Sequence, residues 1–188
     1  TLSDLSSGMI RDARRALGRK DKRFSFEVFD CAKIPHKGCN FDLVIANHVL
    51  FYCEDIPAVC NEIQRVLVPG GKLICSTYGS HHMQEVSQLV QDFDNRIVLS
   101  ADRLYERFGR ENGADILAPY FSDIFWESYN DSLLVPDAEP LISYILSCHG
   151  NQNQYLLDKY KDFRGFVSRK TKDGFFITKD AGIFLCEK

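Results

Sequence analysis

The chain has 188 residues, of which 45% are hydrophobic and 26% are charged, and this composition suits a folded domain with a substantial core. Its net charge is −3 and its pI is about 5.9, so composition gives no reason to expect a nucleic-acid or membrane-surface partner. The sequence contains no apolar run of about 18 residues, which excludes a membrane-spanning helix, and no secretory leader follows Thr1.

The first part of the chain is predicted to form a helix and two strands. The helix begins after Ser6 or Ser7, whose hydroxyl can cap it, and ends near Gly18. Residues 24–29 and 41–46 are predicted strands. The second is almost entirely apolar, which is typical of a parallel strand that is buried on both faces.

A strand–helix–strand unit then continues from residues 41–46. Asp55 caps a helix whose first turn contains Pro57, and apolar residues recur along it at helical spacing. A Pro-Gly-Gly turn at residues 69–71 ends this helix, and residues 72–76 form the next strand. Strands joined in this way through a helix make a parallel, right-handed unit.

The rest of the chain is predicted to be mainly helical, with strands near the end. Helices are expected at residues 83–93, 101–112 (capped by Ser100), 137–148 and 154–167, and strands at 121–129, 175–178 and 182–186. No internal repeat or linker is visible, so a single domain is expected.

Polar residues follow several of these strands. They are Asp30 with Cys31, then Asn47 with His48, and then residues 78–82. Asp4 ends the short segment before the first helix, a segment too short to assign by itself, and we place it with this set. In a doubly wound sheet, ligands bind beyond the carboxyl ends of the strands. Two acids at successive strand ends fit a nucleoside, because carboxylates accept hydrogen bonds from ribose hydroxyls or from an adenine amino group.

Five segments carry a family resemblance. SDLSSGMI, FDCAKIP, FDLVIANHVLFY, LVPGGKLI and the C-terminal DGFFITKDAGIFLCEK resemble segments of class I S-adenosylmethionine (SAM) dependent methyltransferases, of the small-molecule type found in ubiquinone and menaquinone biosynthesis. The resemblance implies an α/β fold, a three-layer Rossmann-like doubly wound sheet that is mostly parallel with an antiparallel C-terminal strand. In that family a strand and a glycine-rich loop precede the first segment, so the chain is expected to be N-terminally truncated.

The resemblance also implies a set of residues that bind SAM or its product S-adenosylhomocysteine: Asp4, Leu5, Met9, Asp30, Cys31, Asn47 and His48. Asp4 would bind the ribose hydroxyls, while Leu5 and Met9 would pack against adenine. Asp30 would accept the adenine amino group, and the Cys31 amide would bond a ring nitrogen. Asn47 and His48 would border the methionine part of SAM. The whole chain, 1–188, would be one methyltransferase domain, with a cofactor-binding half (1–79), a helical substrate-side segment with the sixth strand (80–170) and C-terminal strands (171–188).

Simpler roles remain open for several of these residues. Asp30 could cap a turn before Pro35, Met9 could belong only to the core, and Asn47 and His48 could satisfy backbone groups at a strand end. The seven basic residues within 11–23 are expected to form a solvated helix face. The seven cysteines include no C-x-x-C pair and predict a reduced, cytoplasmic protein.

The catalytic residues are unknown from the sequence. Methyl transfer from a sulfonium needs alignment of the reacting atoms, and a general base only if the acceptor must lose a proton. His48, His81 and His82 are the candidates for that base. His81 and His82 are adjacent, so on a helix they would not face each other, and no metal site is expected.

The predicted function is methyl transfer to a small organic acceptor. The alternatives are an inactive methyltransferase-like module for binding or assembly, and an RNA methyltransferase, which the acidic balance disfavours. Absence of the central first strand would expose two strand edges. A longer N-terminal segment, another chain such as a second copy, or a rearranged sheet is expected to close them.

Overall fold

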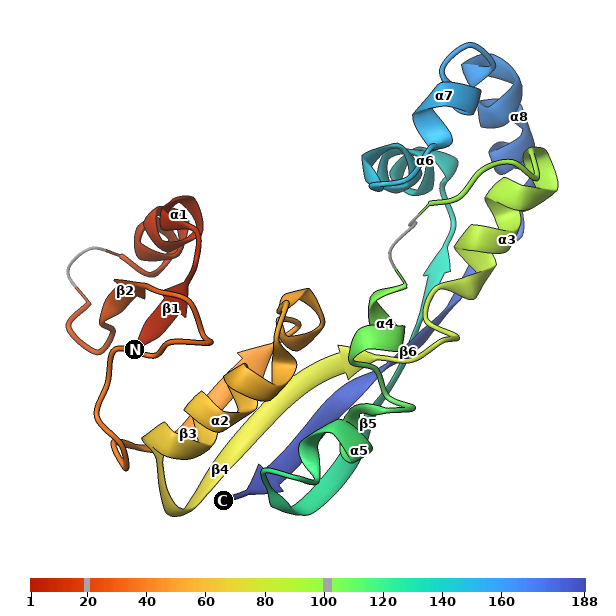
Figure 1. Ribbon diagram of the computed structural model, residues 1–188. Helices are drawn as coiled ribbons and strands as arrows, with labels where there is room; N and C mark the ends of the chain where they lie inside the picture. The colour runs from red at the N-terminus through yellow and green to blue at the C-terminus, as the bar shows by residue number, and fades with distance from the viewer. Residues whose placement is uncertain (19–20, 100–102) are drawn as a thin grey trace. The chain divides into compact units, whose positions relative to one another are not determined.

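The computed structural model describes residues 1–18, 21–99 and 103–188 (Figure 1). The chain forms two compact units. The first unit consists of Thr1–Cys75, Ala114–Phe125 and Phe184–Lys188, and the second consists of Ser76–Gly113 and Trp126–Ile183. No helix in the described ranges is long and apolar enough to cross a membrane.

The first unit begins with a strand–helix–strand motif. Strand β1 (Leu2–Asp4) pairs in parallel with β2 (Phe26–Val28), so that Leu2 lies opposite Phe26. Helix α1 (Ser7–Leu17) connects them and is capped by Ser6, whose hydroxyl accepts a hydrogen bond from the Met9 amide at 3.3 Å. It ends at Gly18, whose φ of 88° is accessible to glycine, as the sequence predicts.

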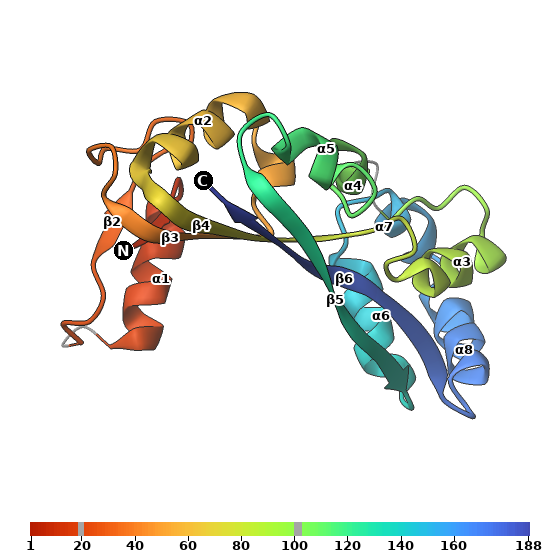
Figure 2. The same ribbon diagram turned by 90° about the horizontal axis from the view of Figure 1, so that it is seen from below.

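The main body of the first unit follows the predicted strand–helix–strand pattern. It contains β3 (Phe41–Asn47), a 3-10 helix η1 (Leu50–Tyr52), α2 (Ile56–Val66) and all but the last three residues of β4 (Leu67–Tyr78). Helix α2 lies along β3 and β4 in both views (Figures 1 and 2), and it buries its apolar face. The Pro-Gly-Gly turn is part of β4, where Gly70 has a φ of 74°.

In the part of the chain that the structure describes, the strands form two sheets. The larger has the order β3-β4-β6-β5, where β5 is Ser122–Val135 and β6 is Phe175–Glu187. Figure 2 shows β5 and β6 running side by side. The two C-terminal strands predicted from the sequence are one continuous strand, β6. Among the described residues, β1 and β2 make a separate two-stranded sheet. With parallel and antiparallel pairs in the larger sheet, the predicted α/β class is confirmed.

The second unit is built around a helical core. Helices α3 (Gln84–Phe93), α6 (Ala138–Ser147), α7 (Gln152–Leu156) and α8 (Tyr160–Lys170) supply most of it. Helix α6 packs against α7 and α8, and α8 packs against α3. The buried cluster includes Val90, Ile142 and Phe163. The single helix predicted at 154–167 is therefore two helices, which are separated at residues 157–159.

The helix predicted at residues 101–112 is wrong over its described part. Ser100 and residues 101–102 lie outside the described residues, and of the rest only α4 (Leu104–Arg107) is helical, before α5 (Gly113–Leu117) begins. The Asn112 side chain explains the break. It accepts a hydrogen bond from the Gly109 amide at 2.7 Å and donates one to the Glu106 carbonyl at 2.8 Å, so it competes with the helical hydrogen bonds.

Candidate functional site

The first candidate site lies at the carboxyl ends of β1 and β2. Asp4 is the last residue of β1, and its Oδ1 accepts a hydrogen bond from the Ser6 amide at 2.7 Å. Its carbonyl accepts one from the Phe29 amide at 3.3 Å, which continues the pairing toward Asp30. Both acidic side chains are exposed. The parallel pairing thus brings Asp4 and Asp30, the two acids predicted to bind the nucleoside, to the same edge of one small sheet.

Asp30 also caps the turn that follows it. Its Oδ1 accepts a hydrogen bond from the Ala32 amide at 2.9 Å, and its carbonyl accepts one from the Lys33 amide at 2.8 Å. The turn-capping role that the sequence left open is therefore real. These contacts use only Oδ1 of the Asp30 carboxylate. Its second oxygen, Oδ2, can therefore also accept a hydrogen bond from a ligand.

The two apolar residues predicted to pack against adenine are on the surface. Leu5 is 73% exposed and Met9 is 58% exposed, whereas Ile10 is the buried residue of α1. The interpretation of Met9 as only a core residue is thus wrong. Large exposed apolar side chains beside two carboxylates suit a ligand that has a flat ring and hydroxyl groups.

The end of β3 contributes a strained residue. Asn47 ends the strand, and His48 follows with a φ of 48°, a left-handed conformation that few residues other than glycine adopt. The His48 ring lies 6.1 Å from the ring of Phe51, and the side chain is exposed. Such strain is concentrated at functional sites.

A pair of thiols joins the loops after β2 and β3. The Sγ atoms of Cys31 and Cys53 are 3.5 Å apart, and the Cys53 thiol also lies 3.5 Å from the Val49 carbonyl. The hydrogen bond from Cys53 lowers the pKa of Cys31 to about 7, against the opposing effects of burial and of the Asp30 carboxylate. The two cysteines are 22 positions apart, and no pattern in the sequence pointed to their contact.

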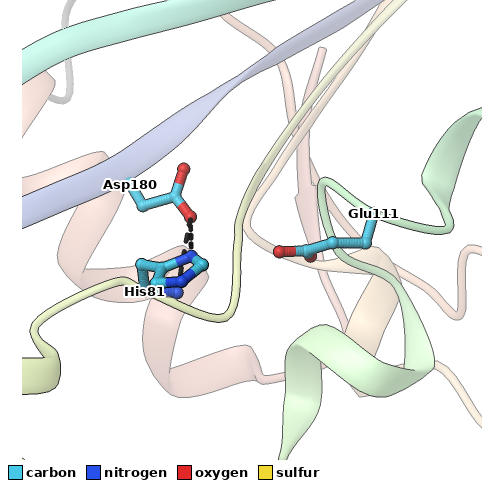
Figure 3. A group of neighbouring side chains, drawn as sticks. All are labelled: His81, Glu111 and Asp180. Carbon is cyan, nitrogen blue, oxygen red and sulfur yellow. Dashed lines mark hydrogen bonds and ion pairs between the residues drawn. The ribbon is translucent and has the colours of Figure 1, made fainter.

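The second unit contains a polar cluster of His81, Glu111 and Asp180, shown in Figure 3. Nδ1 of His81 lies 3.8 Å from Oδ2 of Asp180. The Asp180 side chain is only 10% exposed and accepts a hydrogen bond from Arg110 at 2.8 Å. Sequence reasoning found His81 but not its two acidic neighbours, because long loops and strand β6 bring them together.

Internal contacts account for the geometry of this polar cluster. Ser80 donates two hydrogen bonds to Glu111, from its amide and its hydroxyl, each at 2.9 Å. Although burial opposes the effect, these bonds hold the pKa of Glu111 below its ordinary value. A side chain at Gly79 would overlap the Asp180 carboxylate. The three ligand atoms could hold a cation, but Arg110 already neutralises Asp180.

The remaining sequence candidates are placed as follows. His82, a candidate base, lies in the turn before α3, with its ring 5.2 Å from that of Tyr78.

In the basic segment 11–23, several cations have partners. Arg15 pairs with Asp12, Arg23 pairs with Asp21, and Arg14 lies over the Phe26 ring. These contacts agree with a solvated helix face. Arg19 and Lys20 lie outside the described residues.

Part of the chain is similar to known methyltransferases. A family model described as a methyltransferase domain matches residues 1–75. The biotin biosynthesis bifunctional protein BioHC of Saccharophagus degradans is 33% identical over 94 residues, which make up 50% of this chain and 17% of that protein. Malonyl-[acyl-carrier protein] O-methyltransferase of Methylovorus sp. is 28% identical over 102 residues, which make up 52% of this chain and 34% of that protein. The chain thus spans about a third or less of the length of these curated relatives.

Solved structures show the same fold. A putative methyltransferase from Bacillus halodurans aligns over 99% of this chain and 81% of its own, with a TM-score of 0.63 and 14% identity. Phospholethanolamine N-methyltransferase 2 of Haemonchus contortus, solved with S-adenosylhomocysteine, aligns over 99% of this chain and 42% of its own, with a TM-score of 0.53 and 19% identity. Residues 1–75 match a methyltransferase domain, and the fold is that of the class I SAM-dependent methyltransferases, as the motifs predicted.

Proposed function

We propose that this chain belongs to a SAM-dependent methyltransferase that transfers a methyl group to a small organic acceptor. The observation that carries the proposal is the position of Asp4 and Asp30, at the carboxyl ends of two parallel strands within the segment that matches the methyltransferase domain. The name of the Methylovorus relative, malonyl-[acyl-carrier protein] O-methyltransferase, supports an acceptor that carries a small organic acid. The absence of disulfides among the seven cysteines, all of them in described residues, supports a cytoplasmic location.

The side chains of the first unit fit the nucleoside half of SAM. Asp4 would hold the ribose hydroxyls, Asp30 and the Cys31 amide the adenine edge, and Leu5 and Met9 the adenine face. Asn47 and His48 would border the methionine part. When bound, SAM supplies an electrophilic methyl group. The chain's own task is then to align the acceptor with that methyl group and to exclude water.

A base is needed only for an acceptor that must lose a proton. We propose His48 for this role, because its side chain is exposed and it adopts a left-handed backbone conformation directly after β3. His81 and His82 stay candidates in the second unit.

Calorimetric titration of the protein with S-adenosylhomocysteine tests the proposal. Micromolar binding is expected. In a separate assay with methyl-labelled SAM as the donor, transfer of the label to malonyl-[acyl-carrier protein] or to related small acids is expected. No binding at millimolar ligand by the folded protein would contradict it. Binding without transfer to any small acceptor would favour the inactive module. Transfer to RNA, with salt-sensitive binding, would favour an RNA methyltransferase.

We also propose that a further strand pairs with β1 and β3. Within the described residues β1 pairs with β2 and β3 pairs with β4, while Leu43 and Ile45 of β3 are 45% and 56% exposed. Apolar strand edges of this kind pair readily with other chains. The strand would come from an N-terminal segment of the protein or from a second copy.

Sedimentation of the 188-residue chain tests pairing with a second copy. The chain is expected to form dimers or larger species, and replacing Ile45 with lysine should shift it toward monomer. A monodisperse monomer that is unchanged by this substitution would contradict pairing with a second copy.

A further inference from the structure

Cys31 and Cys53 are distinguished from the other cysteines by their contact with each other. Their Sγ atoms are 3.5 Å apart and both side chains are half-buried. Cys60, Cys75 and Cys186 are buried, and burial raises the pKa of each thiol, that of Cys60 to about 11. Only small movements separate the Cys31–Cys53 pair from disulfide geometry, because a disulfide joins sulfur atoms at about 2.05 Å.

We propose that Cys31 and Cys53 form a reversible disulfide, and that this disulfide disrupts the nucleoside end of the cofactor site. The first part rests on the geometry of the two thiols. The second part rests on the function proposed above. Cys31 directly follows Asp30. Cys53 is the C-cap of the 3-10 helix η1, which begins two residues after His48. A bond between them would therefore pull together the two loops that carry the predicted ligands.

The oxidation balances with hydrogen peroxide as the oxidant. The Cys31 thiolate attacks one peroxide oxygen, the O–O bond breaks, and the leaving hydroxide takes a proton to become water. Cys53 then attacks the resulting sulfenic acid, the S–O bond breaks, and a second water leaves. The two thiols lose two electrons and two protons, and peroxide is reduced to two waters. A thiol reductant reverses the reaction by thiol–disulfide exchange.

Cys31 is suited to be the attacking thiol. Its pKa is lowered to about 7 by the Cys53 hydrogen bond, so its reactive thiolate increases as pH rises through that value. The rate of cross-linking is therefore expected to rise from about pH 6 to about pH 8 and then to level off. Cys148 is a matched control, because it is also half-buried but burial raises its pKa.

Peptide mapping by mass spectrometry tests the disulfide directly. The 188-residue protein is treated with hydrogen peroxide, and a linked peptide containing Cys31 and Cys53 is expected, lighter by two hydrogen atoms and removed by dithiothreitol. It should be absent in Cys53→Ser and in Cys31→Ser, and present in Cys148→Ser. A thiol pair that stays reduced, that is oxidised only to sulfinic acid, or that links only between molecules would overturn the proposal.

Titration with S-adenosylhomocysteine before and after oxidation tests the consequence for the site. Oxidised wild-type protein is expected to bind at least about tenfold more weakly, which corresponds to about 1.4 kcal/mol, while peroxide should not change the affinity of Cys31→Ser, which lacks the attacking thiol. Unchanged affinity in a protein with a mapped disulfide would overturn the link to the site. If the reduced protein does not bind the ligand at all, the proposed function fails, whereas the mapping result stands independently.

Discussion

Replacing Asp4 with alanine is expected to weaken S-adenosylhomocysteine binding by at least about 100-fold. In the proposed site the carboxylate accepts hydrogen bonds from two ribose hydroxyls, and a hydrogen bond to a charged group contributes about 1.5–3 kcal/mol. Two such bonds amount to about 3 kcal/mol or more, and every 1.4 kcal/mol corresponds to about a tenfold change in affinity. Isothermal titration of the wild type and the variant measures the difference.

Two further variants make this result interpretable. Asp12→Ala removes an exposed carboxylate of α1 whose ion pair with Arg15, at 3.4 Å, is on the surface, so its affinity should match that of the wild type. Asp4→Asn keeps an acceptor for the Ser6 amide, which Asp4 bonds at 2.7 Å, and should preserve the start of α1 while binding the ligand less tightly. An Asp4→Ala protein with native circular dichroism and wild-type affinity would show that Asp4 is no ribose ligand.

Replacing Phe163 with alanine is expected to destabilise the second unit by about 3–5 kcal/mol, the usual result of emptying a buried aromatic site. Phe163 is fully buried in the helical core, and its ring lies 5.1 Å from that of Phe93. A domain is typically stable by only about 5–15 kcal/mol, so this loss is a large fraction. Urea unfolding, followed by the fluorescence of the single tryptophan, Trp126, reports on this unit.

Phe176 is the matched control for this substitution. It is also a phenylalanine of the second unit, but it lies on β6 and is 54% exposed. Phe176→Ala should therefore change the free energy of unfolding by less than about 0.5 kcal/mol. Equal effects of the two substitutions would mean that the helical core does not stabilise the second unit as the packing indicates.

The capping signals in the sequence were accurate for α1 and α2. Ser6 caps α1 and Asp55 caps α2, with hydrogen bonds to the amides of Met9 and Ala58, because a capping side chain bonds an amide only a few residues away. Asp30 could be found for a similar reason, because it follows a strand that the sequence predicted, whereas Asp4 was found through the resemblance of SDLSSGMI to a methyltransferase segment. The helix predicted at 101–112 failed where the Asn112 side chain took the backbone groups that a helix would use.

The sequence by itself determined the α/β class, the strand–helix–strand unit of residues 41–76 and the methyltransferase resemblance, and it proposed the acids Asp4 and Asp30 as ligand-binding candidates. These features depend on short-range spacing, on capping and on motifs that are contiguous in the chain. Only the tertiary structure decided that Cys31 meets Cys53 and that His81 lies beside Asp180. It also decided that Met9 is exposed while Ile10 is buried. Such contacts depend on which loops and strands meet, and side chains far apart in the sequence carry no local pattern that records their meeting.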